Sequence, residues 1–405
     1  MRAASLMSTI AAVAALIGCR DDSSSPTAPL SEPALAAATS ALSFRQISGG
    51  ESHTCGVTTD NRAYCWGQNS AGVLGNGTTT NSSRPKAVAG GLHFLQISAG
   101  YQHTCGVTTD YKAYCWGANL RSQLGDGTTT SRSTPVAVIS GYRFRDVRAG
   151  FLHTCGVTTS NKAYCWGDNG YNQLGDTTSG VGRRQRPFPV VGGLSFQQVV
   201  AGSLHTCGVT TDHRGYCWGD GSTGQIGDGT TSRRRAPTAV AGGLLWSQVA
   251  AGDRHSAGGS HSCGLTTTGR GYCWGGNDKG QLGDGTTTRR LKPVAVAGGL
   301  TYSGVTPGSE HTCGVTTGGL AYCWGWRYYG ALGDGSPLGD VSPPRLTPIA
   351  VVGGLSFSRL NTGGAHTCGV TTASSAYCWG ANNAGQLGDD TQINSSGPVA
   401  VVGSN

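Results

Sequence analysis

The stretch HTCGVTTDNRAYCWG at residues 53–67 decides the fold, and the chain repeats it with small changes seven times. Cys55 and Cys65 lie symmetrically about Asp60, as do Val57 and Ala63. This symmetry predicts two antiparallel strands joined by a turn of three or five residues. The residue after the centre is Asn or Gly in four of the seven copies, as a left-handed turn position requires. We therefore expect a β-hairpin in every copy.

The cysteines of each hairpin are expected to form a disulfide. In the predicted register they oppose each other at a Cα separation of about 4.5 Å, which a disulfide tolerates. Fifteen cysteines are also too many for a cytosolic chain without a metal or redox role. The predicted pairs are Cys55–Cys65, Cys105–Cys115, Cys155–Cys165, Cys207–Cys217, Cys263–Cys273, Cys313–Cys323 and Cys368–Cys378.

The spacing of the copies predicts a propeller. The first cysteine recurs after 50, 50, 52, 56, 50 and 55 residues, a period that propeller blades show. A short apolar segment such as 94–98 precedes each hairpin, and another such as 135–138 follows the Gly-rich segment after it. Four short strands per unit make one antiparallel blade. Residues 42–403 are therefore expected to form an all-β, seven-bladed propeller.

The motifs of each unit also resemble a known repeat family. His-Thr-Cys-Gly-Val, Tyr-Cys-Trp-Gly-x-Asn and Gly-Gln-Leu-Gly-Asp-Gly-Thr, parts of which are seen at 311–335 and 366–391, are similar to the regulator of chromosome condensation repeat. The resemblance covers about residues 42–403 and implies a seven-bladed propeller. Family members present one face to a protein partner. The paired cysteines depart from the nuclear members and suit an exported, bacterial variant.

The first 41 residues are expected to lie outside the propeller. Residues 1–18 have Arg2 near the start and an apolar run from Leu6 to Ile17, which is typical of an export signal and too short to span a membrane. The run ends at Leu-Ile-Gly-Cys19, which resembles a bacterial lipobox and implies lipidation of Cys19. Residues 19–41 would then be a lipidated Cys and a flexible Ser/Pro/Ala tether. We expect attachment to the cell envelope, with the outer membrane or cell surface favoured.

Three polar or aromatic residues recur once per unit, and we interpret them as framework. A histidine two residues before the first cysteine shares its strand face, so zinc binding is an alternative to a packed histidine. The recurrent tryptophan is expected to pack between blades. The Asp of Leu-Gly-Asp is expected to cap a turn rather than bind a cation. These positions are His53, His103, His153, His205, His261, His311, His366; Trp66, Trp116, Trp166, Trp218, Trp274, Trp324, Trp379; and Asp126, Asp176, Asp228, Asp284, Asp334, Asp389, with Asn76 in the first unit.

No catalytic, metal or cofactor motif emerges from the chain. It has no Gly-x-Ser-x-Gly, no His-Glu-x-x-His and no phosphate-binding Gly-Lys-Ser. One active site does not need seven copies of its residues. We therefore expect function to lie where the repeats differ.

The first difference between repeats is positive charge. The segment before the last strand of units three to five is rich in basic residues, on a chain of net charge +8. Equivalent segments lie on one face or rim of a propeller, so the sequence predicts a basic arc that attracts anions. We define the basic arc by its residues in these units, which are Arg183, Arg184, Arg186, Arg233, Arg234, Arg235, Arg289, Arg290 and Lys292.

The second difference is aromatic. Unit six carries Trp326-Arg327-Tyr328-Tyr329 where unit seven has Ala-Asn-Asn-Ala, and a Pro-rich loop follows it. Trp, Tyr and Arg are enriched at protein-binding hot spots. The alternative is that these side chains pack under their own loop.

Three hypotheses for function follow. The first is a monomeric, non-catalytic protein-binding module held at the envelope. The second is a surface protein that binds a polyanion, such as an acidic polysaccharide, a lipid headgroup or a nucleic acid, through the basic arc; salt sensitivity separates it from the first. The third is a hydrolase or lyase, which would require paired carboxylates from different blades in a deep central pocket.

Overall fold

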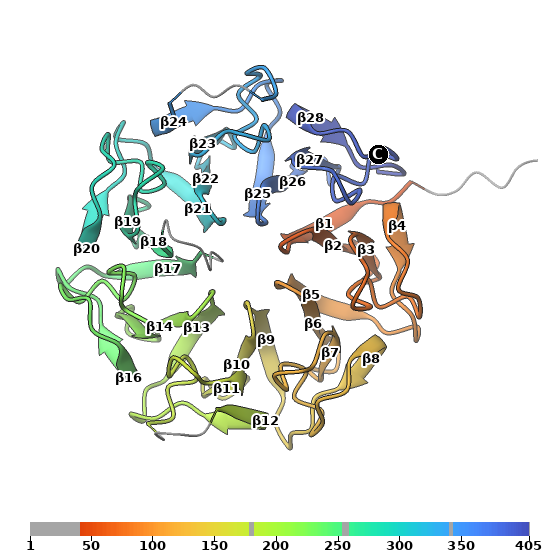
Figure 1. Ribbon diagram of the computed structural model, residues 1–405, viewed down its shortest axis with the longest axis vertical. Coiled ribbons are helices and arrows are strands. Elements are labelled where there is room, and N and C mark those ends of the chain that lie inside the picture. Colours follow the sequence, from red (N-terminus) through yellow and green to blue (C-terminus); the bar gives the residue numbers. More distant parts are fainter. Residues whose placement is uncertain (1–40, 178–181, 253–258, 340–342, 405) are drawn as a thin grey trace, which may run out of the picture. The chain divides into compact units, whose positions relative to one another are not determined.

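Seven four-stranded antiparallel sheets surround a central axis in the computed structural model (Figure 1). It describes residues 41–177, 182–252, 259–339 and 343–404. The predicted seven-bladed propeller is confirmed. Cys19, the proposed signal and nearly all of the tether lie outside the described residues, as does the middle of the Pro-rich loop of unit six. No helix among the residues described is long and apolar enough to cross a membrane.

Each blade consists of four consecutive strands. Blade 1 contains β1 (Phe44–Gly49), β2 (His53–Thr58), β3 (Ala63–Gly67) and β4 (Ser82–Ala87). Blade 2 contains β5 (Phe94–Ala99), β6 (His103–Thr108), β7 (Ala113–Gly117) and β8 (Arg132–Ala137). Blade 3 contains β9 (Phe144–Ala149), β10 (His153–Thr158), β11 (Ala163–Asp168) and β12 (Arg183–Pro189). Blade 4 contains β13 (Phe196–Ala201), β14 (His205–Thr210), β15 (Gly215–Gly219) and β16 (Arg234–Ala239).

Blades 5 to 7 follow the same order. Blade 5 contains β17 (Trp246–Ala251), β18 (His261–Thr266), β19 (Gly271–Gly275) and β20 (Arg290–Ala295). Blade 6 contains β21 (Tyr302–Pro307), β22 (His311–Thr316), β23 (Ala321–Gly325) and β24 (Arg345–Ala350). Blade 7 contains β25 (Phe357–Thr362), β26 (His366–Thr371), β27 (Ala376–Gly380) and β28 (Ser395–Ala400). The first strand of each blade lies innermost and the fourth outermost (Figure 1).

The hairpins have the predicted register. Cys55 opposes Cys65 and Val57 opposes Ala63, and the same pairing recurs in all seven blades. Asn61 has φ 67° and the N–H of Thr58 donates to the carbonyl of Arg62, so three residues form the turn. Even Tyr111 adopts the left-handed conformation at this position, with φ 65°. The cysteines of each pair are disulfide-bonded, with Cα separations of 4.0–4.1 Å.

The hydrophobic core is divided among the seven blade interfaces. Between blades 1 and 2, the buried Cys55–Cys65 disulfide and Val57 pack against Phe94 and Trp116 of the next blade. Gly75 approaches the same ring so closely that a Cβ there would lie 2.5 Å from Trp116 Nε1, and its φ of 68° also favours glycine. The recurrent tryptophan therefore packs between blades, as predicted.

The ring closes through side chains rather than a shared sheet. Blade 7 is built from one repeat, with β25 to β28 in sequence order. Phe44, Ile47 and Trp66 of blade 1 pack against Cys368, Val370 and Leu387 of blade 7 in the same type of core as elsewhere. Leu42 and Ser404 form an isolated parallel bridge between the two ends of the propeller.

Candidate binding surfaces

The recurrent histidines form a hydrogen-bonded network that joins the blades. Each Nε2 lies 2.8–3.0 Å from the hydroxyl of a Thr or Ser in the next blade, as for His53 and Thr104. That hydroxyl donates to a loop carbonyl of the preceding blade, such as that of Val73, which also accepts from Trp116 Nε1. Because the hydroxyl proton is used in this way, the hydroxyl must accept from the histidine, which assigns the proton to Nε2.

This network explains why the histidines are framework and not zinc ligands. The seven rings are at most 2% exposed. Burial lowers their pKa from about 6.5 to about 3 for His53, His103, His153, His261 and His366, and to about 4 for His205 and His311. The neighbouring cysteine sulfurs are bonded to each other, and no three potential metal ligands gather anywhere in the described part of the chain.

The recurrent Asp carboxylates cap turns in blades 2 and 4 to 7, as predicted, and bind arginines in blades 2 to 6. In blade 5, Asp284 Oδ1 accepts from the backbone N–H of Thr286, and Arg290 Nε lies 2.8 Å from Oδ2. Burial alone would raise the pKa of Asp284, but the bonds from Thr286 and Arg290 lower it overall. The corresponding pairs are Arg132–Asp126, Arg184–Asp176, Arg234–Asp228 and Arg345–Asp334, at 2.6–3.3 Å.

The basic arc is therefore corrected in two respects. Its residues lie largely in the outermost strands β12, β16 and β20, not in a loop before them (Figure 1). Arg184, Arg234 and Arg290 are neutralised by buried carboxylates and belong to the framework. Charges and prolines on an outermost strand also prevent edge-to-edge association of sheets, and each of these strands carries a proline.

The other six residues of the basic arc remain exposed. Three of them donate over 3.3–3.5 Å to a loop carbonyl of the preceding blade: Arg183 to Leu120, Arg233 to Gly170 and Arg289 to Ser222. Arg233 also lies over the ring of Tyr171, 4.7 Å from its centroid. Arg186, Arg235 and Lys292 are exposed on the outer strands. The solvent-facing arc thus has six basic side chains rather than nine.

The aromatic residues of blade 6 form a cluster in the loop between β23 and β24. The rings of Trp326 and Tyr328 stack at 5.4 Å with an interplanar angle of 10°, and Tyr329 contacts both edge-on. Tyr328 is 39% exposed, and Trp326 and Tyr329 are half-buried. We call Trp326, Tyr328 and Tyr329 the aromatic cluster. The rings pack on one another, and part of the cluster faces solvent.

Arg327 does not belong to this surface. It is 8% exposed and occupies the position held in blade 2 by Asn119, whose amide donates to the carboxylate of Asp126. Burial would raise the pKa of Asp334, but bonds from Ser336 and Arg345, together with the charge of Arg327, lower it. Arg327 thus compensates for the missing Asn inside its own blade, which corrects its prediction as a partner contact.

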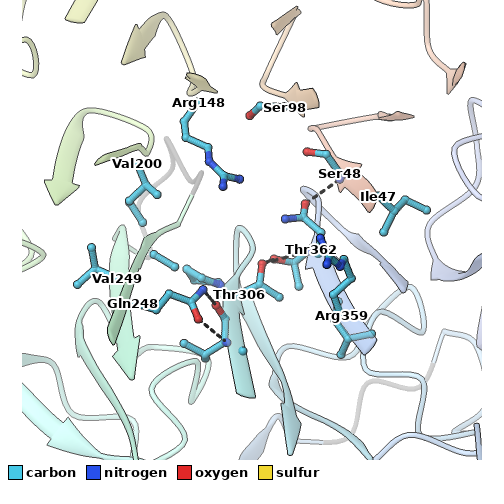
Figure 2. A pocket seen from close by; sticks show the side chains of 18 of the residues that line it. Ile47, Ser48, Ser98, Arg148, Val200, Gln248, Val249, Thr306, Arg359 and Thr362 are labelled. Atoms are coloured by element: carbon cyan, nitrogen blue, oxygen red, sulfur yellow. Dashed lines mark hydrogen bonds between the residues drawn. The ribbon is translucent and has the colours of Figure 1, made fainter. Parts of the chain in front are cut away.

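A central cavity of about 370 Å³ is lined mainly by the innermost strands of the propeller (Figure 2). Sequence reasoning missed it, although the inner strands differ from one another at their third position. Gln46, Gln96 and Gln248 each bond the backbone of the next inner strand, whereas Asp146 and Arg359 stand at the equivalent positions of blades 3 and 7.

The lining of the central cavity includes Arg148 and Arg359 and no carboxylate of the described chain. The paired carboxylates that a hydrolase or lyase would require are not found in this lining.

The architecture can now be compared with known proteins. The profile of the RCC1-like domain matches residues 15–352. The chain belongs to the RCC1-like domain family. Human E3 ubiquitin-protein ligase HERC2 is 30% identical over 98 residues, which are 24% of this chain and 2% of HERC2. The chain thus matches only a very small part of that curated relative.

Solved structures share the fold of this RCC1-like propeller. Yeast RCC1 (Prp20), crystallised bound to Kap60, aligns with a TM-score of 0.73 and 20% identity over 89% of this chain and 85% of its own. Human WBSCR16 aligns with a TM-score of 0.74 and 21% identity over 84% of this chain and 94% of its own. At these identities the likeness shows the fold alone.

Proposed function

We propose that this RCC1-like propeller is a non-catalytic module that binds a protein partner through the aromatic cluster of blade 6. The observation that carries the proposal is the stacked and partly exposed Trp326–Tyr328 pair. Blade 2 has Ala118 and Leu120 at the equivalent positions, so the framework does not require aromatic residues there. Trp and Tyr are enriched among the few residues that dominate the binding energy of protein interfaces. Yeast RCC1, a relative by fold, was crystallised in complex with Kap60.

The repeated polar residues support a binding role over a catalytic one. The histidines are buried against the next blade, and the recurrent Asp carboxylates bind turn N–H groups and arginines. These groups maintain the ring and are not presented to a substrate. The blade-specific residues of the aromatic cluster are the ones available for recognition.

Replacing Trp326, Tyr328 and Tyr329 together by alanine is expected to weaken partner binding by roughly a hundredfold or more, because hot-spot aromatics contribute at least about 2 kcal/mol each. The partner is first captured on the immobilised oxidised protein from envelope extract in high salt and identified by mass spectrometry. Its Kd is then measured against both proteins. Leu120→Ala is the matched control, since Leu120 is 74% exposed at the position equivalent to Tyr328 in blade 2. Equal affinity of the triple variant and the wild type would refute the role of the cluster.

The second candidate function is polyanion binding, favoured by the exposed Arg186, Arg235 and Lys292 on the outer strands. Exposed charges are screened within about 8–10 Å at physiological salt. Retention of acidic polysaccharide or nucleic acid at low salt only, lost when these three residues become Gln, would support this function and leave the aromatic cluster as packing.

We further propose that the protein is exported and anchored at the bacterial envelope through a lipid on Cys19, with residues 20–41 as tether. The disulfide in every blade supports an oxidising compartment. Cys19→Ser is expected to move the protein from the membrane to the soluble fraction and to abolish incorporation of labelled fatty acid. Cys19 is the odd cysteine of fifteen, so this change leaves every disulfide intact. Membrane retention of the variant would contradict the anchor.

A further inference from the structure

The innermost strands concentrate positive charge around the central cavity. The seven strands β1, β5, β9, β13, β17, β21 and β25 carry four arginines and one carboxylate. Arg148 is paired with Asp146 at 3.0 Å, and Arg45 and Arg145 bond carbonyls of the next blade. Arg359 has no ion pair with any carboxylate of the described residues. Burial, and then the charge of Arg359, lower the pKa of Arg45. Of the four arginines, Arg148 and Arg359 line the cavity, so the described part of its wall carries two guanidinium groups and no carboxylate.

The polar residues of the cavity wall use their acceptors on neighbouring blades. Ser48 Oγ accepts from the N–H of Ala99, and Ser98 Oγ accepts from the N–H of Ala149. Asn361 Oδ1 accepts from the N–H of Gly49, and Gln198 Oε1 accepts from the N–H of Val249. Each of these contacts joins one blade to the next. The acceptor atoms of the wall are therefore occupied in holding the ring together.

Within the described parts of the chain, the donors of these four side chains remain available. The hydroxyl protons of Ser48 and Ser98 and the amide NH₂ groups of Asn361 and Gln198 are not used in these contacts. Figure 2 shows Ser48, Ser98, Arg148 and Arg359 around the same cavity. A wall of unused donors and guanidinium groups is complementary to an anion, which offers only acceptors. It is poorly complementary to a cation.

We propose that the central cavity binds a small hydroxylated organic anion through its carboxylate or phosphate group. Guanidinium groups pair strongly with both anions, and a recess with charge of one sign concentrates the opposite sign. The volume of about 370 Å³ lies within the range of ligand pockets. The remaining hydroxyl and amide donors suit the hydroxyl oxygens of an acidic sugar or a sugar phosphate. This site is separate from the aromatic cluster, so the proposal does not depend on the one for protein binding.

Calorimetry with the purified oxidised protein tests the site. The probes are galacturonate for the carboxylate, glucose 6-phosphate for the phosphate, and glucose as the neutral control, in about 20 mM salt where screening is weak. We expect one or both anions to bind and glucose not to bind. The stronger of the two anions identifies the group that the cavity selects. Failure of both anions to bind would overturn the proposal.

Two variants locate the binding in the cavity. Arg359→Gln removes an exposed charge and is expected to weaken anion binding by roughly tenfold or more, the worth of one charged hydrogen bond. Asn361→Asp keeps the acceptor for Gly49 but replaces the donor by a negative charge, so it is expected to abolish binding. Arg270→Gln removes one exposed charge from the hairpin turn of blade 5, outside the cavity lining, and is the matched control. Wild-type affinity in both cavity variants, with unchanged far-UV spectra, would overturn the proposal.

Discussion

Mild acid is expected to unfold this propeller, with a transition between about pH 4 and pH 5.5. In the unfolded chain the seven recurrent histidines take up protons below about pH 6.5. In the folded protein burial holds their pKa near 3 or 4, so they stay neutral. The unfolded state therefore binds more protons. Once a histidine is fully protonated in the unfolded chain, it lowers the free energy of unfolding by about 1.4 kcal/mol per pH unit. Stability is complete above pH 6.5 and decreases as the pH falls towards the native pKa.

The geometry explains why these histidines resist protonation. An imidazolium would carry a second N–H at Nδ1, and the Nδ1 atoms of His103, His153 and His205 are buried without a hydrogen-bond partner in the described structure. Seven such sites act together because each joins two blades of one closed ring. Tryptophan fluorescence and far-UV circular dichroism across a pH series would follow the transition. Native spectra at pH 4 would contradict this account.

A single substitution provides the control for the acid transition. His103→Gln keeps a side-chain N–H donor for the Thr154 hydroxyl but cannot take up a proton. It is expected to reduce by about one the number of protons taken up on unfolding, seen as a shallower dependence of stability on pH. His93→Gln makes the same replacement at an exposed histidine outside the network and is the matched control.

Reduction of the disulfides is expected to cause the second large loss of stability. Each disulfide joins residues ten positions apart, and the chain-entropy relation assigns such a loop about 2–3 kcal/mol. Seven independent loops together exceed the net stability of an ordinary domain, about 5–15 kcal/mol. The fully reduced chain is therefore expected to be unfolded or to unfold at much lower urea than the oxidised protein. Equal urea midpoints for the two forms would refute this.

Accessibility determines how fast this loss occurs. All fourteen cysteines of the hairpins are 0% exposed, so a reductant reaches them only when a blade opens. Thiol release from the native protein should be slow and should accelerate sharply in urea. Cys155→Ala with Cys165→Ala removes one pair, and under oxidising conditions it should lower the free energy of unfolding by roughly the contribution of one loop plus that of a small cavity. After full reduction of both proteins, the difference in the free energy of unfolding between the variant and the wild type should shrink to the contribution of the small cavity.

Some of the framework pairing left a signal in the sequence. The arginine at or near the start of the fourth strand occurs in units two to six, each of which has the Gly-Asp carboxylate (preceded by Ile226 in unit four and by Leu in the others), and the first unit has Asn76 and Ser82 instead. This joint occurrence indicates pairing of Arg with Asp and would have removed Arg184, Arg234 and Arg290 from the basic arc. Unit seven breaks the pattern, since Asp389 is followed by Ser395. Similarly, Arg327 stands in unit six at the position that Asn119 has in unit two. This correspondence indicates that Arg327, like Asn119, has a role inside its own blade.

The sequence by itself determined the number of blades, the hairpin register, the turn residues and the seven disulfides. These features depend on contacts within one repeat, where spacing along the chain sets spacing in space. Only the tertiary structure decided how the blades join. The His53–Thr104 bond and the bond from Trp116 to the Val73 carbonyl connect residues that are far apart in sequence or lie in different repeats. The pattern inside one repeat predicts that the tryptophan packs between blades, but it does not specify these partners.

The central cavity is also a feature that only the tertiary structure decided. Arg148 and Arg359 come from blades 3 and 7, and they face one cavity only because seven units close into a ring. In the linear chain each is one variant residue at one position of a short apolar strand. Their common environment arises from closure, which places seven equivalent strand faces around a single axis.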